Sequence, residues 1–142
     1  MKFLYTGIEV TDLEQSIRFY HEGLGMEVAG RGLVAATGGE TATLHTPGAE
    51  QMLELNWYPS SKYTPGSELD HLAFEVDDVE ATASRLVELG GRVVREVEHE
   101  PDYDLAYVTD PDGVWIEIVH PKKRRHRGGA GAPPGARSTM NR

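Results

Sequence analysis

The chain has 142 residues, 39% of them hydrophobic and 26% charged, a balance typical of one globular domain. It contains no cysteine, which excludes disulfide bonds, thiolate metal ligands and cysteine nucleophiles. No apolar segment approaches the roughly 20 residues that a membrane span needs, and no signal-peptide core follows Met1. We therefore expect a cytoplasmic protein without membrane contact.

The net charge of −9 conceals a basic C-terminus. Seven of the 14 basic residues and none of the 23 acidic ones lie in residues 121–142, a segment rich in glycine that we predict to be a disordered tail. This tail is either a contact for an anionic surface or a solvated extension, and terminal charge runs favour the second. The remaining body is strongly acidic, which disfavours nucleic acid as a partner.

The first predicted strand and helix are repeated later in the chain. Residues 5–13 and 71–79 coincide, at a spacing of 66, at Glu9 and Glu75, Val10 and Val76, and Asp12 and Asp78. In each copy a strand leads into a helix with apolar residues at helical spacing. Asp12 and Asp78 are the predicted N-caps, and Gly25 and Gly91 are the predicted C-cap glycines.

The repeat continues beyond the helices at a spacing of 63. Here the matching positions are Glu54 and Glu117, Leu55 and Ile118, and Leu44 and Tyr107. The shift of three residues indicates a longer connection around the glycine-rich residues 29–39 of the first copy, a change that loops tolerate. Each copy therefore reads as βαβββ.

The predicted fold is α+β, with two tandem βαβββ modules in a single domain over residues 1–120. Module one spans residues 2–57, a turn-rich linker spans 58–68, and module two spans 69–119.

Strand parity predicts a metal site. Successive side chains of a strand point to opposite faces, so Glu54, His71 and Glu117 lie opposite the aliphatic side chains of their strands. Taken alone, each is more often a solvated or hydrogen-bonded residue. Their symmetric placement favours a divalent cation, because unpaired charges on a dry face are costly. Such oxygen-rich ligation suits Zn, Ni, Mn, Fe or Mg.

Several segments resemble the vicinal-oxygen-chelate superfamily, which includes glyoxalases, bleomycin resistance proteins, epimerases and dioxygenases. The segments are 10–20 for its opening helix, 52–57 and 70–78 for its metal strands, and 110–118, beginning Asp-Pro-Asp-Gly, for its closing signature. The resemblance spans residues 1 to about 121. It implies a concave, partly closed mixed sheet with the helices outside, and it is more specific for fold than for reaction.

The sequence is most similar to small bacterial lactoylglutathione lyases, in which a His, a Glu, a His and a Glu on strands one, four, five and eight bind the metal. Glu54, His71 and Glu117 fill the last three places, but Tyr5 occupies the first. Three explanations compete: a three-ligand site completed by water, a Tyr5 hydroxyl that binds the metal or hydrogen-bonds a ligand, or a decayed site. We favour the first, because a catalytic metal needs open positions.

The resemblance implies a metal-dependent lyase or isomerase acting on a small substrate with vicinal oxygens, with Glu54 or Glu117 moving the proton. An epimerase or dioxygenase is an alternative, although a dioxygenase requires a second His ligand. A third candidate is a metal-free binding or resistance protein. Members of the family often share the site across a dimer interface, so we also expect a homodimer.

Overall fold

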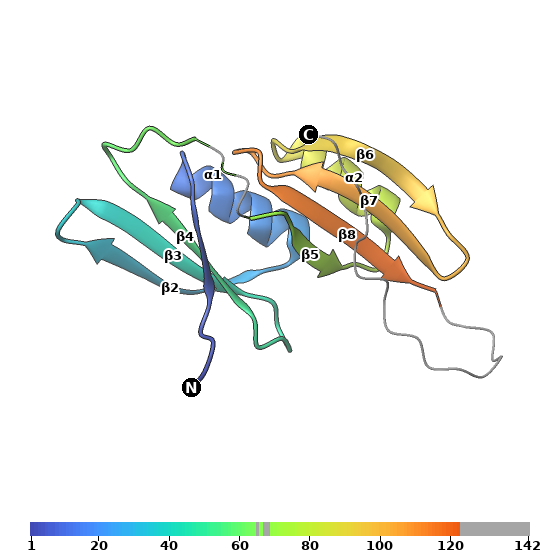
Figure 1. The fold of residues 1–142 in the computed structure, drawn as a ribbon, viewed down its shortest axis with the longest axis horizontal. Helices are drawn as coiled ribbons and strands as arrows, with labels where there is room; N and C mark the ends of the chain where they lie inside the picture. The colour runs from blue at the N-terminus through green and yellow to red at the C-terminus, as the bar shows by residue number, and fades with distance from the viewer. Residues whose placement is uncertain (65, 67–68, 123–142) are drawn as a thin grey trace.

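The computed structural model of the protein describes residues 1–64, 66 and 69–122 and contains two βαβββ modules (Figure 1). Module one comprises β1 (Thr6–Glu9), α1 (Leu13–Arg18), the π-helical η1 (Phe19–Gly23), β2 (Glu27–Val34), β3 (Gly39–His45) and β4 (Met52–Trp57). Module two comprises β5 (Leu72–Glu75), α2 (Val79–Glu88), β6 (Arg92–His99), β7 (Tyr103–Thr109) and β8 (Trp115–Pro121). The predicted α+β fold is confirmed. The tail from residue 123 onward lies outside the described residues.

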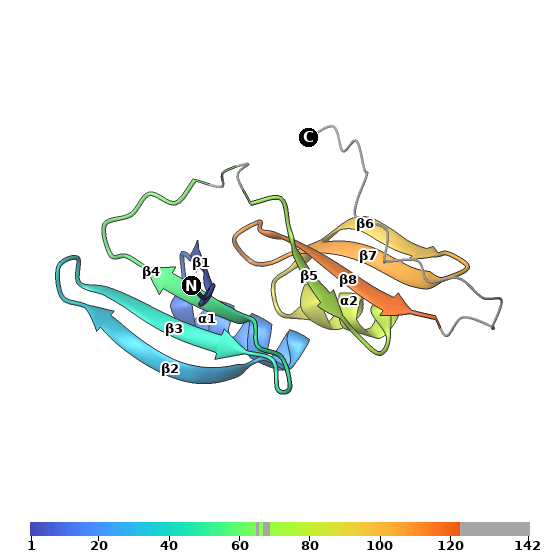
Figure 2. The same cartoon turned by 60° about the horizontal axis from the view of Figure 1, so that its bottom comes forward.

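The two sheets have the same topology. Their strand orders are β1-β4-β3-β2 and β5-β8-β7-β6, with the first pair of each sheet parallel and the other pairs antiparallel. Figure 2 shows the sheets next to one another, and no strand of one is hydrogen-bonded to a strand of the other among the described residues. Consequently β1 and β5 are both edge strands. None of the helices in the described part of the chain has the length and apolar character that crossing a bilayer requires.

The helix caps confirm one prediction and correct another. The carboxylates of Asp12 and Asp78 accept the backbone N–H groups of Gln15 and Ala81, as N-caps do. The glycines with left-handed backbone at the helix ends are Gly25, with φ of 69°, and Gly90, with φ of 103°. The prediction of Gly91 as the second C-cap is therefore wrong.

This error has a structural cause. From N-cap to C-cap glycine, the first helix is one residue longer than the second, and the π-helical turn η1 absorbs the additional residue. The spacing between the copies therefore falls from 66 to 65 within the helix, not after it.

The register of the strands corrects the predicted match between Leu44 of module one and Tyr107 of module two. Glu54 lies opposite Thr43 on β3, and Glu117 lies opposite Tyr107 on β7. The counterpart of Tyr107 in module one is thus Thr43, not the predicted Leu44. Because neighbouring residues of a strand face opposite sides, this shift by one residue moves Tyr107 from the helix face to the face that carries Glu117.

The two modules share one hydrophobic core on the helix side of the sheets. It includes Phe19 and Tyr20 of η1 together with Leu86 of α2, all fully buried. At Gly23 the helices are so close that a Cβ atom would lie 2.5 Å from a methyl carbon of Leu86. An ion pair of 2.9 Å between Arg85 and Glu22 closes the exposed side of this contact.

Asp110 joins the modules at a buried carboxylate. It is 1% exposed and accepts the Tyr20 hydroxyl at 2.9 Å and the backbone N–H groups of Asp112 and Val114, also at 2.9 Å. Burial raises the pKa of Asp110, and the three hydrogen bonds oppose that rise. The next carboxylate of the Asp-Pro-Asp-Gly turn, Asp112, accepts the backbone N–H and the hydroxyl of Thr11. The closing signature thus fastens module two to module one.

We predict that Gly91→Ala destabilises the protein by about 1–3 kcal/mol, because its Cβ atom would lie 2.6 Å from the carbonyl oxygen of Thr109 and 2.9 Å from that of Leu86. Gly30→Ala is the control, since a Cβ atom there meets nothing within 4 Å, and its effect should stay within about 0.5 kcal/mol. Urea unfolding of both variants measures the difference. Equal effects would contradict the close packing at Gly91.

Candidate functional site

The candidate ligands lie on the sheet faces that the helices do not cover. In β4, Leu53 and Leu55 are buried toward the core while Glu54 between them is half-buried on the other face. In β8, the aliphatic neighbours of Glu117 are fully buried and Glu117 itself is half-buried. The alternation inferred from the sequence is therefore present in both final strands.

Module two brings two of the predicted ligands together. His71, directly before β5, has Nε2 3.3 Å from Oε2 of Glu117. Its other nitrogen, Nδ1, lies 2.6 Å from the Asp70 carboxylate. A carboxylate at Nδ1 holds the proton on that nitrogen and turns Nε2 toward Glu117. Glu117 and Asp70 thus lie on opposite nitrogens of the His71 ring.

Tyr107 is a member of this group that the sequence did not identify. Its hydroxyl donates to Oε2 of Glu117 at 2.7 Å, and its ring contacts that of His71 edge to face, with centroids 5.6 Å apart. Burial raises the pKa of Tyr107, and the neighbouring Glu117 carboxylate raises it further, so the hydroxyl keeps its proton and acts as a donor. The sequence could have identified Tyr107, because the correct register of β7 against β8 is enough to place it opposite Glu117.

Module one carries the remaining predicted residues of the site, Glu54 and Tyr5. Glu54 lies on β4 between Gly7 of β1 and Thr43 of β3. Tyr5, two residues before Gly7 as His71 is two before Ala73, is 46% exposed. Within residues 1–64, 66 and 69–122, no three His, Asp or Glu side chains are placed to share a metal ion. In the described part of one chain, Glu54 is therefore not grouped with His71 and Glu117, and the predicted ligand set stays a prediction.

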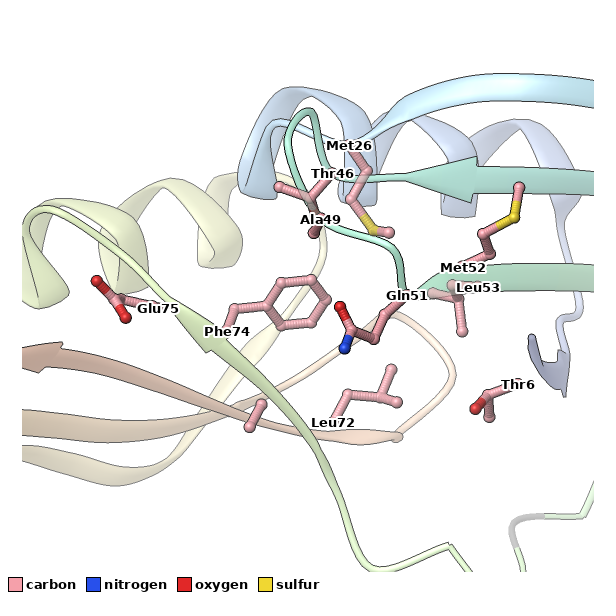
Figure 3. A pocket seen from close by; sticks show the side chains of 11 residues that line it. Thr6, Met26, Thr46, Ala49, Gln51, Met52, Leu53, Leu72, Phe74 and Glu75 are labelled. Carbon is pink, nitrogen blue, oxygen red and sulfur yellow. The ribbon is translucent and has the colours of Figure 1, made fainter. Parts of the chain in front are cut away.

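A cleft of about 400 Å³ opens between the two modules (Figure 3). Its walls are mainly apolar, and Phe74 points from β5 toward the β3–β4 connection that carries Gln51. Met26 and Leu72 also line it, whereas Glu54, His71 and Glu117 do not. The cleft and the group of polar side chains are thus separate features of the molecule.

The chain belongs to the Glyoxalase/Bleomycin resistance protein/Dioxygenase superfamily, whose pattern it matches over residues 2–118. The two βαβββ modules agree with the fold of this superfamily.

Among its relatives is the lactoylglutathione lyase of Neisseria meningitidis, 36% identical over 134 residues that cover 86% of this chain and 92% of that protein. The lactoylglutathione lyase of Haemophilus influenzae is 33% identical over 137 residues, covering 88% of this chain and 96% of that protein. The solved structure of the trypanothione-dependent glyoxalase I of Leishmania major aligns with a TM-score of 0.72 and 29% identity, over 84% of this chain and 86% of that one.

A separate cluster of charges surrounds His99 at the end of β6. Its Nδ1 lies 2.7 Å from Asp104 and its Nε2 lies 3.2 Å from Glu80 of α2, while Lys122 lies 2.7 Å from the same Asp104 oxygen. The hydrogen bond to Asp104 is the main cause that raises the pKa of His99, and Glu80 adds to it.

We predict that an NMR titration finds the pKa of His99 above its usual value near 6.5. Asp104→Asn should lower it markedly and Glu80→Gln less, because Asp104 is the larger cause. Because folding raises the pKa of His99, its ion pairs stabilise the folded protein fully at pH values below the pKa of His99 in the unfolded chain. This stabilisation is lost as the pH rises through the pKa of His99 in the folded protein. An unchanged pKa in Asp104→Asn would contradict the pairing.

Proposed function

We propose that this protein is a metal-dependent lyase of the glyoxalase type, with a divalent ion bound by Glu54, His71 and Glu117. The observation that carries the proposal is the His71–Glu117 pair, in which Nε2 and a carboxylate oxygen face each other at 3.3 Å. The relatives named lactoylglutathione lyase, at 33–36% identity over most of both chains, support the reaction class.

The residues present fit a divalent ion. An imidazole whose far nitrogen is held by a carboxylate, as Asp70 holds His71, is a common arrangement for metal-binding histidines. Two glutamates and one histidine offer oxygen and nitrogen donors of the kind that Zn, Ni, Mn, Fe and Mg accept. Tyr5, in the place of a fourth ligand, has a phenol that is a poor donor to these ions at neutral pH, which leaves open positions for substrate.

The proposed substrate is the hemithioacetal formed by a small 2-oxoaldehyde, such as methylglyoxal, and a thiol. The bound ion supplies positive charge beside the two neighbouring substrate oxygens. One glutamate would take the proton from the carbon that bears sulfur and hydroxyl and return it to the adjacent carbonyl carbon, while the hydroxyl proton passes to the oxygen of that carbonyl. The product is a 2-hydroxyacyl thioester, and the conversion is an isomerisation that needs no oxidant or reductant.

We further propose that two copies of the chain build each site, with Glu54 from one copy and His71 and Glu117 from the other. Within the described residues of one chain these three do not form a group that can share an ion. Glu54 and Glu117 lie on β4 and β8, whose parallel neighbours β1 and β5 are each unpaired along their other edge, which a second copy can extend. The residues that lead into β1 are apolar and exposed, with Phe3 at 84% and Leu4 at 63%.

Elemental analysis tests the metal site. We expect near-stoichiometric divalent metal in the parent protein and none in the Glu54→Gln/His71→Ala/Glu117→Gln variant, and we expect thioester formation from methylglyoxal and glutathione only when an ion is present. Glu9→Gln is the control, because Glu9 lies on β1 outside the proposed ligand set. A metal-free parent without lyase activity would overturn the proposal and favour a metal-free binding protein of the same fold.

Mixing two defective chains tests the shared site. Glu54→Gln and His71→Ala/Glu117→Gln homodimers should each lack metal, whereas purified heterodimers should regain about half of the parent's metal and activity, since one of their two sites is intact. Differently tagged chains allow the heterodimer to be isolated. A heterodimer without metal would show that each chain builds its own site.

A further inference from the structure

We propose that Tyr107 is a positioning residue that holds the carboxylate of Glu117 in one orientation for the ion. This inference rests on the proposed function, since it assigns a role within that metal site.

The contact is direct and involves a defined oxygen. The Tyr107 hydroxyl donates to Oε2 of Glu117 at 2.7 Å, and the same oxygen faces Nε2 of His71 at 3.3 Å. Tyr107 and Glu117 are register partners on β7 and β8, so the backbone itself sets the distance between them. A hydrogen bond to a carboxylate of this length is a strong one, and it fixes the rotation of the carboxylate plane.

The phenol has little freedom to release this bond. Tyr107 is 2% exposed, and its ring is held between the edge of His71, at 5.6 Å, and Trp115, at 6.0 Å. The guanidinium of Arg95 lies 6.0 Å from the ring centroid and is itself held by two hydrogen bonds to Glu98. A donor locked by its neighbours can orient a ligand without losing much side-chain entropy when the ion binds.

Module one has no equivalent of this arrangement. The register partner of Glu54 on β3 is Thr43, and on β1 it is Gly7, where module two has Tyr107 and Ala73. Among the described residues, no side chain donates a hydrogen bond to the carboxylate of Glu54. The phenol that orients Glu117 therefore has no counterpart among the register partners of Glu54.

Metal affinity of Tyr107→Phe tests the inference, because this change removes only the hydroxyl. We expect Zn²⁺ titration against a chromophoric chelator to give unchanged stoichiometry and a dissociation constant raised by about tenfold, the lower end of the range for groups that orient metal ligands. Tyr103→Phe on the same strand is the matched control and should bind as the parent does. The unfolding midpoint of the metal-free proteins separates this effect from a loss of fold stability.

A double variant shows whether Tyr107 acts through Glu117. In the Glu117→Gln background, Tyr107→Phe should cause no further loss of affinity. Parent-like affinity in Tyr107→Phe, or an equal additional loss in the double variant, would overturn the inference while leaving the proposed metal site intact. A parent protein that binds no Zn²⁺ would overturn both.

Discussion

The contact between the modules depends on one buried carboxylate. Asp110 sits at 1% exposure with its oxygens occupied by the hydroxyl of Tyr20 and by two backbone N–H groups of its own turn. Removing the Tyr20 hydroxyl would leave the buried Oδ2 without a partner, which costs more than the net gain of an ordinary hydrogen bond. This hydrogen bond joins module two to η1 of module one inside the shared core, beside the contacts of Thr11 with Asp112 and of Glu22 with Arg85.

The Asp110 contact joins the modules on the side of the sheets opposite to the candidate ligands. The modules meet through η1, α2 and the Asp110 turn, all on the helix side of the sheets. The opposite faces, which carry Glu54 in one module and His71 with Glu117 in the other, remain open and are not joined within the described part of one chain. This arrangement is the basis of our proposal that a second copy completes the site, with β1 and β5 as the edges it would extend.

Much of the fold could be predicted because the relevant signals are local. The N-caps and the alternation in β4 and β8 each depend on residues a few positions apart, and the repeat is a match between two such local patterns. The errors came from insertions that change the spacing between copies. A π-helical turn moved the C-cap from Gly91 to Gly90, and a one-residue shift between strands exchanged Leu44 for Thr43 as the counterpart of Tyr107. Sequence spacing cannot locate an inserted residue when the insertion leaves the hydrophobic pattern intact.

The site was predicted less completely than the fold, because its geometry depends on contacts between distant segments. Parity identified the face of Glu54, His71 and Glu117, but only the three-dimensional arrangement separates Glu54 from the other two and adds Tyr107 to them. The most direct test of the shared metal site is a crystal structure of the protein grown with Ni²⁺ or Zn²⁺ and measured at the metal's absorption edge. The account predicts an anomalous peak between Glu54 of one copy and His71 and Glu117 of another. A peak bound by these three residues from a single chain, or no peak beside His71, would contradict it.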